Sequence, residues 1–204
     1  MIATALAFSG HIGSGKSTLS RAVADAIGAA RVSFGDHVRA VARHQGEPET
    51  RERLQAIGEA LVASKMNDFC QSVLDQANAA PSEHVVIDGV RHAEVVECLR
   101  NLVTPRRLLL VYVETDISTR RSRRADRSAD DQVGNDDAHS TEVQVASVLR
   151  RLADLTVSGS DDPPTVVQHV LDWLSRVDLP SSANTNGGGA IPRFSGGRIA
   201  KHAS

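Results

Sequence analysis

A loop rich in glycine and serine near the start of the chain has the residue types that hold phosphate groups. The stretch FSGHIGSGKST fits the pattern G-x-x-x-x-G-K-[ST] at every fixed position, from Gly10 to Ser17. Glycines let the backbone curl so that successive N–H groups point at phosphate oxygens, and a helix beginning near Lys16 adds the positive end of its dipole. We therefore expect a site for a nucleoside triphosphate rather than a chance glycine-rich turn. The residues expected to contact it are Gly10, His11, Ile12, Gly13, Ser14, Gly15, Lys16, Ser17 and Thr18.

Three side chains would supply the chemistry of a magnesium–nucleotide complex. Lys16 would reach the β- and γ-phosphates as a point charge, and the Ser17 hydroxyl would be a ligand of Mg²⁺. Asp88 ends the apolar run HVVID, where a carboxylate would hold Mg²⁺ through water. The alternative for Asp88 is a turn-forming residue before Gly89. The expected cofactors are ATP and Mg²⁺, although no residue fixes ATP over GTP as the donor.

Apolar strands that alternate with helical patterns must position these residues. The predicted strands cover residues 2–9, 31–34, 84–89, 106–115 and 155–159. The predicted helices cover residues 16–27, 36–80 in several pieces with a break at QGEPET, 93–102, 116–124, 140–154 and 163–177. This alternation predicts an α/β fold with three layers, in which helices flank a five-stranded parallel sheet.

Two segments that contain arginine give a resemblance to a family. The stretch VSFGDHVRAVARHQG resembles the segment after the second strand of adenylate kinases and related nucleoside monophosphate kinases, with Gly35, Asp36 and Arg39 at matching positions. The stretch VVIDGVRHAEVVE resembles their Asp-Gly-x-Pro-Arg segment through Asp88, Gly89 and Arg91, but it lacks the proline and is one residue shorter. The stretch RERLQAIGEALV is similar to a segment of phage-type deoxynucleoside monophosphate kinases. The resemblance covers about residues 1–175 and implies the P-loop kinase fold.

The resemblance implies that Arg39 and Arg91 clamp the phosphate of the acceptor. Arginine suits this role because its planar fork grips phosphate bidentately and stays charged. A monophosphate acceptor is already a nucleophile, so the site must mainly position and neutralise two polyanions. Asp36 keeps three interpretations: it could cap the following helix, assist the metal, or act as a base toward a hydroxyl acceptor.

The stretch DISTRRSRRADRS occupies the place of the mobile lid of these kinases. Arg123 and Arg127 would share one helix face, as would Arg120 and Arg124. We favour Arg123 and Arg127 as lid arginines that close over the donor and expel water. The alternative is a solvated basic surface paired with the acidic residues at 130–137.

The residues support one leading hypothesis, transfer of the γ-phosphoryl group of Mg·ATP to a nucleoside or deoxynucleoside monophosphate. The loop SGHIGSGKST also looks like that of dephospho-CoA kinases, which phosphorylate a hydroxyl and would use Asp36 as base. The third strand here ends VVIDGVR and lacks the Pro-Leu-Leu-Phe-Glu-like segment expected in dephospho-CoA kinases. Arg91 therefore favours a phosphate acceptor. A nucleotide-dependent switch or ATPase module is the alternative from another class.

Composition and length limit the organisation of the chain. Its 204 residues have a net charge of -2, which gives no reason to expect nucleic-acid or membrane binding. We expect a kinase domain over 1–177, with acceptor-binding helices at 36–80 and a lid at 120–137, followed by a disordered tail at 178–204. We also expect small-molecule nucleotide substrates, a cytoplasmic location and a monomer or homodimer. Cys70 and Cys98 are interpreted as two reduced, buried thiols.

Overall fold

A parallel β-sheet forms the centre of the computed structural model, which describes residues 3–125 and 145–177. Its five strands follow the order β2-β3-β1-β4-β5, and every neighbouring pair is parallel, as the sequence predicted. The strands are β1 (Thr4–Ser9), β2 (Ala30–Ser33), β3 (Val85–Val90), β4 (Arg107–Glu114) and β5 (Leu155–Ser158). Because the strands are parallel, their carboxyl ends meet at one edge of the sheet, where open α/β folds bind ligands.

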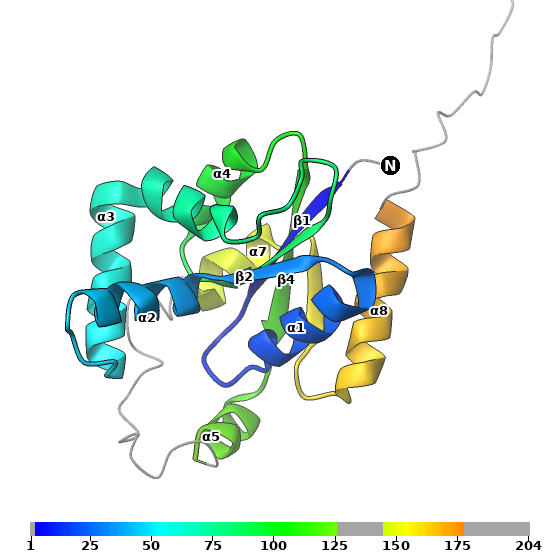
Figure 1. Ribbon diagram of the computed structural model, residues 1–204. Helices are drawn as coiled ribbons and strands as arrows, with labels where there is room; N and C mark the ends of the chain where they lie inside the picture. The colour runs from blue at the N-terminus through cyan, green and yellow to red at the C-terminus, as the bar shows by residue number, and fades with distance from the viewer. Residues whose placement is uncertain (1–2, 126–144, 178–204) are drawn as a thin grey trace, which may run out of the picture.

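Helices cover both faces of this sheet (Figure 1). They are α1 (Lys16–Ile27), α2 (Phe34–His44), α3 (Arg51–Asp75), α4 (Ala93–Leu102), α5 (Ile117–Ala125), the π-helical turn η2 (Val145–Leu149), α7 (Arg150–Leu152) and α8 (Pro163–Val177). The predicted bounds of α1 and α4 are confirmed, and α8 begins at a proline as expected. No helix within residues 3–125 or 145–177 is long and apolar enough to cross a membrane.

Side chains of each inner strand alternate between two apolar cores. Leu6 and Phe8 of β1 pack with α1 and α8 on one face, whereas Ala5 and Ala7 face α2, α3 and α4 on the other. Apolar packing on both faces fixes the strands, and with them the carboxyl edge of the sheet.

The start of α2 differs from the sequence prediction. β2 ends at Ser33 and the helix begins at Phe34, which the sequence had placed in the strand. The Ser33 hydroxyl accepts a hydrogen bond from the backbone N–H of Asp36 at 3.2 Å. Asp36 therefore lies in the first turn, and of its three interpretations the helix cap is wrong, because Ser33 has that position.

The second helical segment forms after the predicted break. The Thr50 side chain caps α3 by accepting from the Arg53 N–H. Lys65 has non-helical angles (φ −145°, ψ 39°), so α3 consists of two helical pieces joined at a kink. The first piece packs Ile57 into the core, and the second packs Phe69, Cys70 and Val73 into it.

Candidate active site

The glycine-rich loop follows β1 directly and leads into α1. Gly10, Gly13 and Gly15 have φ values of 148°, 80° and 90°, which side chains rarely tolerate. A Cβ atom on Gly10 would lie 2.6 Å from the Val113 carbonyl oxygen and 2.8 Å from the Ser14 hydroxyl. The loop is therefore curled against β4, and the strand–loop–helix context of the motif is confirmed.

Lys16 crosses this loop instead of extending into solvent. Its residue is 9% exposed, and its Nζ donates to the carbonyl oxygen of His11 at 3.3 Å. Ser17 and Thr18, which follow it in the first turn of α1, are exposed. This arrangement keeps the ammonium over the loop and leaves two hydroxyls at the open side of the helix start.

Asp88 is a buried carboxylate at the carboxyl end of β3. Asp88 is 2% exposed and pairs across the sheet with Phe8 of β1. Phe8 lies two residues before Gly10, the first residue of the phosphate loop. Asp88 Oδ2 accepts from Arg31 Nη2 at 2.5 Å, while Oδ1 has no hydrogen-bond partner among the described residues. Buried polar atoms normally have a partner, so a buried carboxylate oxygen without one at this edge of the sheet fits a magnesium-bound water.

Arg31 is the site residue that the sequence analysis missed. It comes from β2, and its side chain is 16% exposed. Its Nε donates to the Ser20 hydroxyl of α1 at 3.0 Å, and its Nη1 lies 3.9 Å from Asp36 Oδ2. A charged residue inside a short buried strand was the available signal, because such a residue needs a buried partner.

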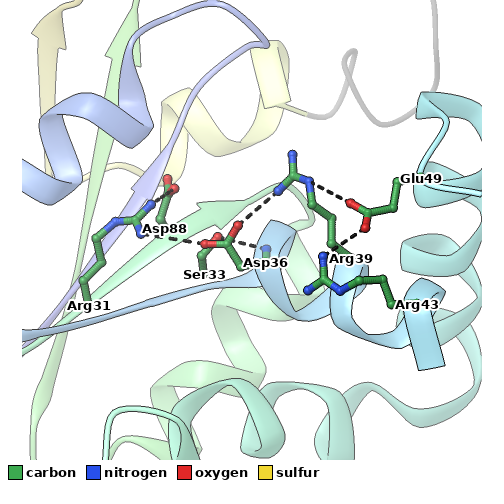
Figure 2. A network of polar contacts seen from close by, with 7 residues as sticks. All are labelled: Arg31, Ser33, Asp36, Arg39, Arg43, Glu49 and Asp88. Carbon is green, nitrogen blue, oxygen red and sulfur yellow. Dashed lines mark hydrogen bonds and ion pairs between the residues drawn. The ribbon is translucent and has the colours of Figure 1, made fainter.

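Asp36 connects the Arg31–Asp88 pair to Arg39 in α2 (Figure 2). Arg39 Nη1 donates to Asp36 Oδ1 at 3.1 Å, and Arg39 Nε lies 4.0 Å from Glu49 Oε2. The Arg39 side chain is 47% exposed, so it has room to turn toward a ligand. A Cβ atom on Gly89 would lie 3.8 Å from the Gly35 nitrogen, so the end of β3 and the first turn of α2 are in contact.

Arg91 and His92 follow β3 and are both partly buried. Burial lowers the pKa of His92; the charges of Glu94 and Glu59 oppose this shift, and that of Arg91 adds to it. Glu59 belongs to the first piece of α3, which therefore faces the segment after β3. His37 points elsewhere: its ring lies 5.5 Å from that of Phe69, its Nδ1 lies 2.8 Å from Gln76 Nε2, and burial lowers its pKa.

A cavity of about 230 Å³ lies between the phosphate loop, β4 and the loop after β5. Its lining includes Thr18, Val113, Arg123, Gly159 and Pro163. Arg123 Nη1 donates to the carbonyl oxygens of Gly159 at 2.8 Å and Ser14 at 3.4 Å. The expected lid arginine Arg123 is thus beside the loop, whereas Arg127 and the acidic residues at 130–137 lie outside the described residues.

Gly159 is a second residue that the sequence analysis did not identify. A Cβ atom there would lie 2.2 Å from both the Ser14 carbonyl oxygen and Thr115 Oγ1. The Thr115 hydroxyl donates to that same carbonyl at 2.9 Å. The loop after β5 and the end of β4 therefore pack directly against the phosphate loop. This close approach requires glycine at position 159.

Together, the parallel sheet and the loop define a protein with the P-loop kinase fold. A family model described as an AAA domain, AAA_18, matches residues 6–142. The chain therefore belongs to the AAA_18 family.

Two relatives are proteins named UPF0200 protein, each 31% identical to this chain. The relative from Methanoregula boonei aligns over 123 residues, which are 60% of this chain and 66% of that protein. The relative from Methanothrix thermoacetophila aligns over 131 residues, which are 64% of this chain and 70% of that protein. The chain thus spans about two thirds of the length of these relatives.

Similar solved structures include two kinds of small-molecule kinase. A gluconokinase from Sinorhizobium meliloti 1021 has a TM-score of 0.58 at 18% identity, covering 86% of this chain and 94% of that one. A shikimate kinase from Aquifex aeolicus vf5 has a TM-score of 0.54 at 15% identity, covering 86% and 99%. At this level of identity the likeness confirms the fold, and it leaves the acceptor to be argued from the residues.

Proposed function

We propose that this protein transfers the γ-phosphoryl group of Mg·ATP to a nucleoside or deoxynucleoside monophosphate. One observation carries the proposal: β3, which holds Asp88 near its carboxyl end, lies between β1 and β2. The phosphate loop follows β1, and the Asp36–Arg39 pair follows β2. A triphosphate on the loop and an acceptor at α2 would therefore meet above Asp88.

The donor would occupy the loop and the adjoining cavity. Its phosphates would accept hydrogen bonds from the loop N–H groups and from Lys16. The cavity beside Thr18, Arg123 and Gly159 would take the base, because it is the hollow that continues from the loop. Arg123 would then lie at the junction of base and phosphates.

Mg²⁺ would be held by Ser17 and, through water, by the buried Oδ1 of Asp88. When bound, the ion neutralises the charge that develops between the β- and γ-phosphates. The residues fit this role because Ser17 is exposed at the helix start and Asp88 Oδ1 has no other partner in the part of the chain that the structure describes.

The acceptor phosphate would be gripped by Arg39 and Arg91. Arg39 already lies in the first half of α2 with its guanidinium beside Asp36, and it is partly exposed. Arg91 comes two residues after Gly89, which contacts the same end of α2. Two guanidinium groups from different elements would converge on one anion and hold it in line with the γ-phosphate.

A kinase with a hydroxyl acceptor, such as dephospho-CoA, is the second candidate. The observation that favours it is the Asp36 side chain, which is 63% exposed at the acceptor end and could accept a proton. The similar gluconokinase and shikimate kinase are named for acceptors of that kind.

The test is an ADP-release assay with Mg·ATP and a panel of acceptors. The panel contains AMP, CMP, GMP, UMP, dTMP, the deoxy forms and dephospho-CoA. Stimulation by one monophosphate is the expected result. Stimulation by dephospho-CoA alone would support the hydroxyl kinase and give Asp36 the role of base. Slow release that no acceptor changes would contradict both and indicate a nucleotide-dependent switch.

A further inference from the structure

We propose that Arg31 is a positioning residue, which orients Asp88 and the first turn of α1 toward the metal of the bound nucleotide. This inference rests on the proposed Mg·ATP site. Arg31 would not contact the nucleotide; it would act through the two residues that face the ion, Ser17 and Asp88.

The guanidinium of Arg31 divides its nitrogens among three elements. Nη2 donates to Asp88 Oδ2 of β3 at 2.5 Å, and Nε donates to Ser20 Oγ of α1 at 3.0 Å. Nη1 lies 3.9 Å from Asp36 Oδ2 of α2. The planar group cannot rotate without losing one of these contacts, so its orientation is fixed by the fold.

Ser20 extends this chain of contacts to the second metal residue. Its hydroxyl accepts from Arg31 and donates to the backbone carbonyl oxygen of Ser17 at 3.1 Å. Ser20 is fully buried, so water does not compete for these hydrogen bonds. Arg31 therefore connects both proposed metal residues, Asp88 directly and Ser17 through Ser20.

The contact with Oδ2 determines which oxygen of Asp88 is left without a hydrogen bond. A carboxylate held at one oxygen by a fixed guanidinium has a fixed plane, and its other oxygen points in one direction. That other oxygen, Oδ1, is the buried atom with no hydrogen-bond partner among the described residues. Arg31 also offsets the cost of burying the Asp88 charge, which would be severe without a partner.

Groups that orient metal ligands typically contribute about 10- to 100-fold to metal affinity. In the Arg31→Gln variant, the gain in nucleotide affinity that Mg²⁺ provides should therefore be about 10- to 100-fold smaller. Arg31→Lys should be intermediate, because an ammonium keeps the charge near Asp88 but lacks the fork that also reaches Ser20. Ser20→Ala should show a smaller loss of the same kind, since it breaks only the link to Ser17.

The experiment is calorimetric binding of a non-hydrolysable ATP analogue to the full chain, with and without Mg²⁺. The variants are Arg31→Gln, Arg31→Lys and Ser20→Ala, with Arg100→Gln as the control. Arg100 is a surface residue of α4 that pairs with Glu97. We expect metal-free binding to stay within about twofold for all four, and the Mg²⁺-dependent gain to fall in the order Arg100→Gln, Ser20→Ala, Arg31→Lys, Arg31→Gln.

Two outcomes would overturn the inference. One is an Mg²⁺-dependent gain that Arg31→Gln leaves intact, and the other is an equal loss with and without metal, which would indicate a purely structural role. Should Arg31→Gln fail to fold, Arg31→Lys and Ser20→Ala decide in the same way. Binding does not require phosphoryl transfer, so failure of every acceptor in the ADP-release assay would remove the proposed function and leave this result standing.

Discussion

The Nη1 atom of Arg123 lies 2.8 Å from the carbonyl oxygen of Gly159, which joins α5 to the loop that follows β5. The same nitrogen lies 3.4 Å from the Ser14 carbonyl oxygen of the phosphate loop. One side chain of the expected lid segment therefore lies beside the proposed donor site. A bound nucleotide would offer this guanidinium negatively charged oxygens in place of backbone carbonyls.

Arg123→Ala should weaken binding of Mg·ATP. Hydrogen bonds to charged groups contribute about 1.5–3 kcal/mol, which corresponds to roughly 10- to 100-fold in the dissociation constant. Arg121→Ala is the matched control, because Arg121 belongs to the same helix and is exposed. Titration of a fluorescent ATP analogue measures both. Equal effects of the two variants would show that α5 contributes only general positive charge.

Gly159→Ala should deform the phosphate loop from behind. The added Cβ would lie 2.2 Å from the Ser14 carbonyl oxygen and from Thr115 Oγ1, so one of them must move. Overpacking of this kind costs about 1–3 kcal/mol of unfolding free energy, and we expect nucleotide affinity to fall as well. Thermal unfolding with and without Mg·ATP measures both effects.

Gly58→Ala is the control for this substitution. Gly58 lies inside α3, and its added Cβ would be 3.8 Å from the nearest atom, a methyl group of Val38. Alanine in a helix is favoured over glycine by about 0.5–1 kcal/mol, so this variant should be more stable and bind nucleotide normally. Loss of nucleotide affinity in Gly58→Ala, or none in Gly159→Ala, would contradict the packing argument.

Lys16→Ala should abolish turnover while the fold remains intact. Lys16 provides the ammonium over the loop, and loss of one group that stabilises developing charge typically lowers kcat by about 100-fold or more. Lys65→Ala, at the exposed kink of α3, should keep normal kcat. The assay is ADP release with the best acceptor, and circular dichroism checks the fold. Undiminished activity of Lys16→Ala would refute the donor site.

Arg91→Ala should impair use of the acceptor far more than binding of ATP. Loss of a charge-assisted contact of about 1.5–3 kcal/mol predicts an acceptor KM roughly 10- to 100-fold higher, with an ATP affinity close to normal. Arg100→Ala, an exposed arginine of α4, serves as the control. If Arg91→Ala weakened both substrates alike, its assignment to the acceptor phosphate would be wrong.

His92 predicts how stability depends on pH. Burial lowers its pKa from the ordinary value of 6.5, so below about pH 6.5 the unfolded chain takes up a proton that the folded chain refuses. The contribution of His92 to the free energy of unfolding should therefore be complete above about pH 6.5. It should be lost as the pH falls through the folded-state pKa of His92. His37 has the same direction of shift, so His92→Gln should reduce the dependence without removing it.

Urea unfolding between pH 5 and pH 8 measures this effect. His169→Gln, which changes an exposed histidine of α8, is the control and should leave the dependence unchanged. An acid loss of stability that is identical in His92→Gln and the unaltered chain would contradict the role of His92.

Local patterns predicted the elements well because their signals lie within a few residues. The apolar spacing of Leu19 and Val23 with Gly28 gave the bounds of α1, and the apolar runs gave every strand. The Phe34 position was wrong because a short strand and a following helix share one apolar residue, and only the Ser33 cap decides where the helix starts.

The parts of the site that were missed depend on contacts between distant segments. Arg31 pairs with Asp88, 57 positions later in the chain, and no local pattern connects them. Gly159 is needed only because the loop after β5 packs on Ser14, which follows from the strand order rather than from the sequence near Gly159. Predicting the partners of either residue would require the order β2-β3-β1-β4-β5 in advance.

The fate of the γ-phosphoryl group tests the central claim most directly. Ion-exchange chromatography of a reaction with Mg·ATP and a monophosphate other than AMP separates ADP from a second nucleoside diphosphate, and a colorimetric assay measures inorganic phosphate. We predict that the second diphosphate appears in step with ADP and that Lys16→Ala produces neither. Inorganic phosphate in step with ADP, with every acceptor left unchanged, would contradict phosphoryl transfer and define a nucleotide hydrolase instead.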